Sequence, residues 1–200
     1  MKKIFYSVLF INAILFGACN ESNNSNGKHS HDGHQHKVSN KDIPVITAEF
    51  ETDSLFQNHV DIMVHFYTHI QTALADDDLE EASLRAKQLK NLMQENDTIS
   101  YSDKGQEMYS KYKTKVIELS NDIQTTDDIE LQRERFENLS NIVYQLVKAS
   151  GSAKLLYKSY CPMAFDGKGA IWLSETEDIA NPYYGASMYS CGSVQELVKR

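Results

Sequence analysis

The spacing of apolar residues between about residues 50 and 75 constrains the fold more than any other feature of the chain. These residues recur in steps of four and three, as they do along the core-facing stripe of a helix in a bundle. They are Phe56, Val60, Met63, Tyr67, Ile70 and Leu74. The spacing predicts one long amphipathic helix.

Three further segments carry the same periodicity and predict helices over about 78–95, 104–123 and 128–150. The residues expected to face inward are Leu79, Ala82, Ala86, Leu89 and Met93, then Met108, Tyr112, Val116, Leu119 and Ile123, then Phe136, Leu139, Val143 and Leu146. Four amphipathic helices with short connections predict an all-α fold, an up-down four-helix bundle over residues 48–151.

Side chains at the ends of these segments fit helix caps. Asp78 and Glu81 have the spacing of a capping box at the start of the second helix. Asp127 is expected to cap the fourth helix, and Gly151 is expected to end it.

Residues 152–200 have a different character and predict a small C-terminal lobe that packs on the bundle. Short aromatic and apolar runs at 155–165 and 170–173 flank a turn cluster at 166–169, which predicts a short hairpin. The Asn181-Pro182 pair and Gly185 predict a tight turn, and a short helix is expected over about 193–199.

Sulfur-bearing residues gather in this lobe as two clusters, Cys161 with Met163 and Met188 with Cys191. Thiolates and thioethers are soft ligands, which select Cu(I) and related ions over hard cations. Two other interpretations stay open: Cys161 and Cys191 form a disulfide, and the methionines fill gaps in a small core. A structural zinc site is less favoured, because it usually takes four Cys or His ligands.

The stretch from Tyr160 to Gly192 resembles the closing motif of an uncharacterised bacterial family, and a weaker resemblance extends upstream over 73–78 and 133–136. That family includes periplasmic lipoproteins and the C-terminal part of adaptor subunits in copper and silver RND efflux systems. The matching residues are Tyr160, Cys161, Pro162, Met163, Ala164, Phe165, Gly169, Ala170, Trp172, Leu173, Ser174, Asn181, Pro182, Tyr183, Gly185, Met188, Cys191 and Gly192. The resemblance covers about residues 50–198 and implies a helical domain with a metal-linked role.

The N-terminal segment, residues 1–18, has the pattern of a lipoprotein signal peptide. A basic start at Lys2 and Lys3 precedes an apolar run that is too short to span a membrane, and the run ends at Gly17-Ala18-Cys19. We expect Cys19 to be lipidated, which would anchor the chain in the bacterial cell envelope, facing the periplasm or the cell surface. Phe16 departs from the usual aliphatic residue, and the alternative is an ordinary secretory signal.

Residues 19–47 are expected to be a disordered tether, because they hold too little apolar surface to offset the cost of ordering them. The tether carries His29, His31, His34 and His36. Four imidazoles in one flexible segment predict a weak, unselective site for Cu(II) or Zn(II), and the alternative is a solvated linker without a specific role.

Three histidines and three methionines fall on the predicted helices. His65 and His69 are spaced i, i+4 on the wetter side of the first helix, where two solvated histidines are the favoured interpretation. His59 lies beside the core-facing stripe. Met63, Met93 and Met108 lie on the apolar stripes and are expected to pack in the core.

Charge and motif content exclude several functions. The net charge of −8 gives no support for nucleic-acid binding, which needs a clustered basic surface. The sequence lacks the nucleophile, zinc-protease, phosphate-loop and dinucleotide motifs of common enzymes, so no enzymatic activity is expected.

The favoured function is an envelope lipoprotein that binds Cu(I), or alternatively Ag(I) or Zn(II), through Cys161, Met163, Met188 and Cys191. The resemblance implies partners such as a heavy-metal efflux adaptor or a copper chaperone. The alternative is a structural or protein-interaction module with a Cys161–Cys191 disulfide.

Overall fold

The computed structural model describes residues 43–95 and 101–200 of the chain, which belong to one compact unit. The elements are, in order, β1 Val45–Thr47, α1 Ser54–Ala75, α2 Leu79–Glu95, α3 Asp103–Thr125, α4 Ile129–Ser150, β2 Leu156–Cys161, α5 Ala164–Gly167, β3 Ala170–Ser174, the 3-10 turn η2 Gly185–Ser187, and β4 Ser193–Lys199. The four predicted long helices are confirmed within a few residues at their ends. The all-α class is too narrow, because a four-stranded sheet accompanies the bundle.

The core of the bundle is built from the residues that the apolar periodicity predicts. All six core-facing residues of α1 are buried, and so are those of the other helices except the half-buried Leu79 and Tyr112. The ring of Tyr67 stacks on that of Phe136 with centroids 5.0 Å apart, which joins α1 to α4. Burial of these stripes drives the helices together, at about 25 cal/mol for each Å² of apolar surface removed from water.

Caps fix where the helices begin and end. The Asp53 carboxylate accepts a hydrogen bond from the backbone N–H of Phe56 at the start of α1, and Asp78 accepts one from Glu81 as predicted. Asp128, one residue after the predicted Asp127, caps α4 by accepting from the N–H groups of Glu130 and Leu131. Gly151 ends α4 with a φ of 77°, a conformation that glycine adopts without steric cost.

The predicted hairpin is confirmed as β2 and β3, which pair antiparallel, and it forms half of a sheet with the strand order β1-β4-β2-β3. The predicted helix at 193–199 is wrong, because these residues form β4. This strand pairs antiparallel with β2 on one edge and parallel with β1 on the other. The hydrogen bonds that two neighbouring strands offer outweigh the weak helical spacing of so short a segment.

The first strand lies inside the segment that the sequence assigns to the tether. Val45, Ile46 and Thr47 pair in register with Leu197, Val198 and Lys199 of β4. The folded unit therefore begins before the predicted boundary at residue 48, and β1 covers an edge of β4 that would otherwise present unpaired backbone groups.

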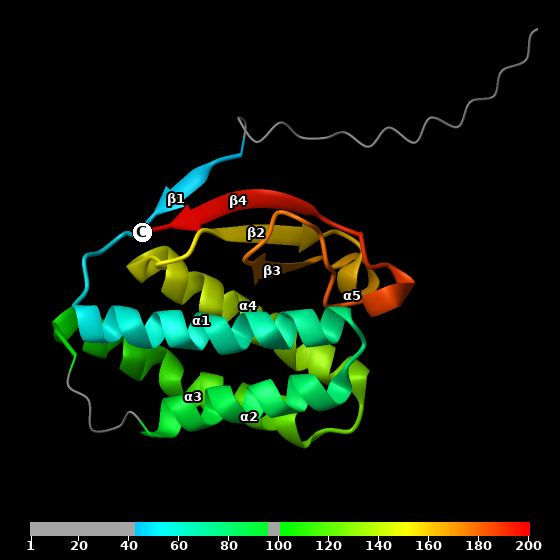
Figure 1. Cartoon of the computed structure of the whole chain (residues 1–200), viewed down its shortest axis with the longest axis horizontal. Helices are drawn as coiled ribbons and strands as arrows, with labels where there is room; N and C mark the ends of the chain where they lie inside the picture. The colour runs from blue at the N-terminus through cyan, green and yellow to red at the C-terminus, as the bar shows by residue number, and fades with distance from the viewer. Residues whose placement is uncertain (1–42, 96–100) are drawn as a thin grey trace, which may run out of the picture. The chain divides into compact units, whose positions relative to one another are not determined.

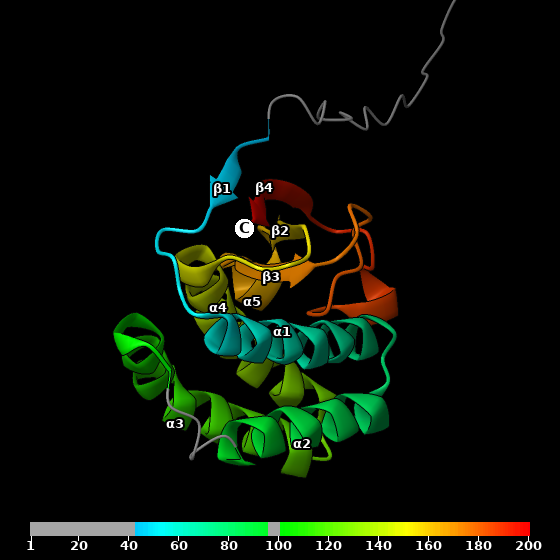
Figure 2. The ribbon, with the colours of Figure 1, turned by 60° about the vertical axis from the view of Figure 1, so that its left-hand side comes forward.

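Three layers are visible in Figure 1 and, after rotation, in Figure 2. The sheet lies over the face of α1 and α4, with β3 in contact with both helices, and α2 and α3 lie on the opposite side. Within the described residues, none of the helices combines the length and apolar character needed to cross a membrane.

Candidate metal site

The fold brings the two predicted cysteines together. Cys161 is the last residue of β2, paired with Ala170 of β3, and Cys191 lies two residues before β4. Because β4 runs antiparallel to β2, its first residues return to the point where β2 ends. The two Sγ atoms lie 2.7 Å apart, and both side chains are free thiols.

The two thiols differ in exposure, and the surroundings of Cys191 favour its protonated form. Cys161 is fully buried, whereas Cys191 is half-buried. Burial, and then the neighbouring Cys161, raises the pKa of the Cys191 thiol to about 11, while a hydrogen bond from the backbone N–H of Met163 acts in the opposite direction. A metal ion or an oxidant must therefore displace a proton to act at this pair.

The backbones of the two predicted methionine ligands, Met163 and Met188, contact Cys191. The N–H of Met163 donates to the Cys191 sulfur, and the Met188 carbonyl accepts from the Cys191 N–H at 3.0 Å. The Met163 side chain is 53% exposed and that of Met188 is half-buried. The backbones of both methionines therefore lie next to Cys191, and the Met163 side chain largely faces solvent.

Asn181 holds the loop that carries Cys191. Its fully buried side-chain amide donates to the carbonyl of Cys191 at 2.8 Å, and its Oδ1 accepts from the N–H of Tyr183 at 2.8 Å. The preceding carbonyl, of Ala180, accepts from the Gln71 amide of α1 at 2.7 Å. The sequence predicts a turn at Asn181 but does not reveal that its side chain positions a cysteine ten residues later.

Aromatic rings pack behind the thiol pair. Trp172 is fully buried and meets Tyr183 edge to face, with centroids 6.0 Å apart. A Cβ on Gly192 would lie 2.7 Å from the Trp172 ring, so glycine is required directly after Cys191. The hydroxyl of Tyr184 donates to the Met163 carbonyl at 2.6 Å. Trp172 and Tyr183 are buried together with Cys161, whereas the Met163 side chain is exposed.

Arg133 joins the bundle to this loop. Its guanidinium, 5% exposed, donates to the carbonyls of Leu74 and Pro182 at 3.1 and 3.0 Å and pairs with Asp77 and Glu130. The second oxygen of Asp77 accepts from the N–H of Ala186 at 2.9 Å. The upstream segments 73–78 and 133–136 thus meet here, where they position the lobe.

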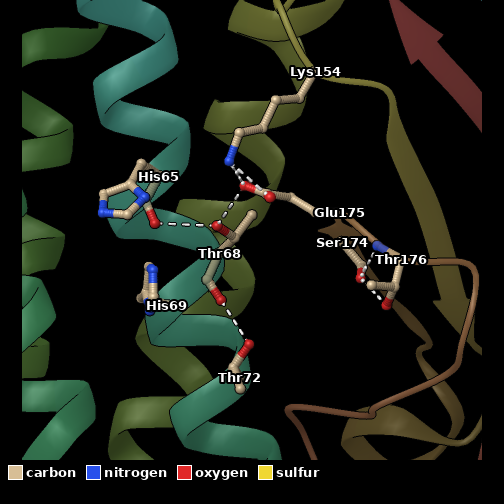
Figure 3. A pocket seen from close by; sticks show the side chains of 8 residues that line it. All are labelled: His65, Thr68, His69, Thr72, Lys154, Ser174, Glu175 and Thr176. Carbon is tan, nitrogen blue, oxygen red and sulfur yellow. Dashed lines mark hydrogen bonds and ion pairs between the residues drawn. The ribbon is translucent and has the colours of Figure 1, made fainter.

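The histidine pair on α1 lies apart from the cysteines. His65 and His69 are exposed, and their ring centroids are 4.5 Å apart. Glu175 lies on the other side of the shallow pocket in Figure 3, where Lys154 binds it at 2.7 Å and the Thr68 hydroxyl donates to it at 3.4 Å. In the described ranges, no group of three or more Cys, His, Asp or Glu side chains is arranged to hold a metal ion.

A second contact between soft donors lies inside the bundle. His59, 5% exposed, places its Nε2 atom 3.3 Å from the Sδ atom of Met93. Burial lowers the pKa of His59 to about 4, so the imidazole is neutral at neutral pH. Met63 and Met108 line the same small cavity. The core position of the three methionines is confirmed, but their convergence on a histidine was not predicted.

The remaining predicted residues, Cys19, His29, His31, His34 and His36, lie outside the described residues.

Residues 63–154 match the model of one family, described as protein of unknown function (DUF3347). The match covers most of the helical bundle and ends before the segment that contains Cys161. No curated protein and no solved structure matches the chain.

Proposed function

We propose that this protein is a lipid-anchored module of the bacterial cell envelope that binds one soft metal ion, Cu(I) or Ag(I), at Cys161 and Cys191. The observation that carries the proposal is the meeting of the two thiols at 2.7 Å, although 30 residues separate them in the chain. Two thiolates supply negative charge and soft sulfur, which together favour a monovalent soft ion over hard cations.

Modest rearrangement would open the pair for an ion. Two thiolates on a tetrahedral ion with metal–sulfur bonds of about 2.3 Å are about 3.8 Å apart, so the sulfurs must separate by about 1 Å. Cys191 lies in a loop and is half-buried, which leaves it freer to move than Cys161 at the end of a strand. The thioethers nearest along the backbone belong to Met188, whose carbonyl closes a turn with the N–H of Cys191, and to Met163; these two would complete the coordination.

Delivery to a heavy-metal efflux adaptor or to a copper chaperone is the role we assign to the bound ion. It rests on the family resemblance of the C-terminal stretch and on the sulfur ligands. The membrane anchor at Cys19 would keep the module beside such envelope partners, and the histidine tether would collect Cu(II) or Zn(II) more weakly.

The test is an anaerobic Cu(I) titration of the full chain against a competing chelator. We define a reference variant in which the potential metal ligands of the N-terminal segment are replaced. It carries Cys19→Ser, His29→Asn, His31→Asn, His34→Asn and His36→Asn. We expect the reference variant to bind Cu(I) tightly, with thiolate-to-copper absorption that disappears when Cys161→Ser and Cys191→Ser are added. Equal binding and equal spectra with and without the two cysteines would overturn the proposal.

A disulfide-stapled interaction module is the second candidate, and the short distance between the thiols supports it equally well. Closing the loop between Cys161 and Cys191 would stabilise the fold by about 3 to 4 kcal/mol. A count of free thiols on protein taken directly from its envelope, under conditions that trap thiols, separates the two. Two free thiols per mature chain favour metal binding, and none favours the disulfide.

A further inference from the structure

The end of the bundle opposite the cysteine pair contains a cluster of four neutral donors. His59 and Met63 lie one helical turn apart on the same face of α1, Met93 comes from α2 and Met108 from α3. All four line one small cavity, whose volume of about 10 Å³ suits a single water molecule or ion. We call them the His–Met cluster.

We propose that the His–Met cluster is a second site for a soft monovalent ion, Cu(I) or Ag(I), built from one imidazole and three thioethers. It stands on residues other than those of the cysteine pair and does not depend on the function proposed above.

The contact between His59 and Met93 has the spacing of two ligands on one ion. Their Nε2 and Sδ atoms are 3.3 Å apart. Two such donors on a tetrahedral ion, with bonds of about 2.0 and 2.3 Å, are about 3.5 Å apart. In the tautomer that carries its proton on Nδ1, the Nε2 lone pair faces the sulfur lone pairs, and a cation coordinated by both atoms turns this repulsion into attraction.

The charge and softness of the cluster select the ion. The four donors are uncharged and no carboxylate lines the cavity. A monovalent ion brings the least uncompensated charge into this buried place, whereas a divalent ion would remain more strongly bound to water. Thioether sulfur favours Cu(I) and Ag(I) over Ca(II) or Mg(II), which prefer oxygen ligands.

The surroundings hold the donors in place. The rings of Tyr101 and Tyr109 contact the His59 imidazole, with centroid separations of 5.8 and 5.3 Å. The Tyr109 hydroxyl donates to the backbone carbonyl of Met93 at 2.8 Å, which fixes that residue beside the imidazole. His59 and Met108 retain 5% and 9% exposure, so the cluster lies close to the surface.

The competing explanation is plain core packing, in which Nε2–H donates a weak hydrogen bond to the Met93 sulfur and the other methionines fill space. The two explanations differ in one respect. Only the metal site makes the three thioether methyl groups respond together to a stoichiometric amount of a soft ion.

The experiment follows the methionine methyl signals by NMR during titration with silver ion. It uses the reference variant with Cys161→Ser and Cys191→Ser added, a chain without thiols, so its outcome is independent of the cysteine site. We expect one equivalent of silver to shift the methyl signals of Met63, Met93 and Met108 and to leave that of Met163 in place. Core methyl signals that stay unchanged under excess silver would overturn the inference.

A pair of conservative variants supplies the matched control. Met93→Leu keeps the volume of the side chain and removes its sulfur, and we expect it to weaken silver binding at the cluster at least tenfold. His65→Asn, which removes an exposed imidazole outside the cluster, should leave that affinity unchanged. Unfolding in urea shows whether Met93→Leu remains folded. An unchanged affinity in folded Met93→Leu would also contradict the site.

Discussion

Arg133 of α4 donates a hydrogen bond to the backbone carbonyl of Pro182 at 3.0 Å, across 49 residues of sequence. The same guanidinium reaches the carbonyl of Leu74 at the end of α1 and the carboxylate of Asp77 in the next turn. One buried side chain therefore links three segments: the end of α1, helix α4 and the loop that leads to Cys191.

Replacing Arg133 should destabilise the fold strongly. In Arg133→Met, the carbonyls of Leu74 and Pro182 lose their donor in a buried place, and we expect the free energy of unfolding to fall by about 2 to 4 kcal/mol. Unfolding in urea measures the change. Arg135→Met is the matched control, since Arg135 is 42% exposed and its ion pair with Asp122 spans 3.5 Å. A loss in Arg133→Met no larger than in this control would contradict the role of Arg133.

Gly185 should tolerate no side chain, for two reasons that can be separated. Its φ is 54°, and a Cβ there would overlap the carboxylate of Asp77 and lie 2.5 Å from the Arg133 guanidinium. We expect Gly185→Ala to cost about 3 kcal/mol or more, measured by thermal or urea unfolding. Gly167→Ala carries the same strain, with a φ of 84° and open space around its Cβ, and should cost about 1 to 2 kcal/mol. Equal losses in the two variants would show that the overlap is relieved without cost.

The hydrogen bonds that Asp77 accepts from Ala186 and Arg133 should make the stability of the fold depend on pH in the acid range. Hydrogen bonds from the Ala186 N–H and from Arg133 lower the pKa of Asp77 below its usual value. A carboxyl with a lowered pKa in the folded state stabilises the fold fully above its unfolded pKa, near 4, and this contribution is lost as the pH falls through the lowered value. The stability difference between the natural chain and Asp77→Asn should therefore shrink below pH 4, as urea unfolding at a series of pH values would measure. A stability difference that stays constant from pH 6 to pH 3 would show that the ionised carboxylate of Asp77 does not contribute to stability.

The helices were predictable because each buries one continuous stripe, and a stripe leaves a period in the sequence. Tyr67, Ile70 and Leu74, for example, follow that period and are fully buried. The C-terminal strand was not predictable in this way. Val194, Leu197 and Val198 have the spacing of a helix face. The segment forms a strand because it pairs with β1 and β2.

The candidate sites were predictable only in part. The sequence indicates that Cys161 and Cys191 are a pair of interest, but the return of β4 along β2 is what brings them together. The contact of His59 with Met93 depends on how α1 packs against α2, which apolar periodicity does not specify. Each methionine taken alone is typical of a core residue, so no local pattern distinguished the His–Met cluster.

The most direct test of the account is X-ray absorption at the copper edge, on the reference variant with Met93→Leu added and loaded with one equivalent of Cu(I). The Met93→Leu substitution keeps the His–Met cluster from competing for the ion. We expect a first shell made of sulfur alone, which is lost when Cys161→Ser and Cys191→Ser are introduced. A shell of nitrogen or oxygen, or a sulfur shell that survives the removal of both cysteines, would contradict a copper site at the Cys161–Cys191 pair.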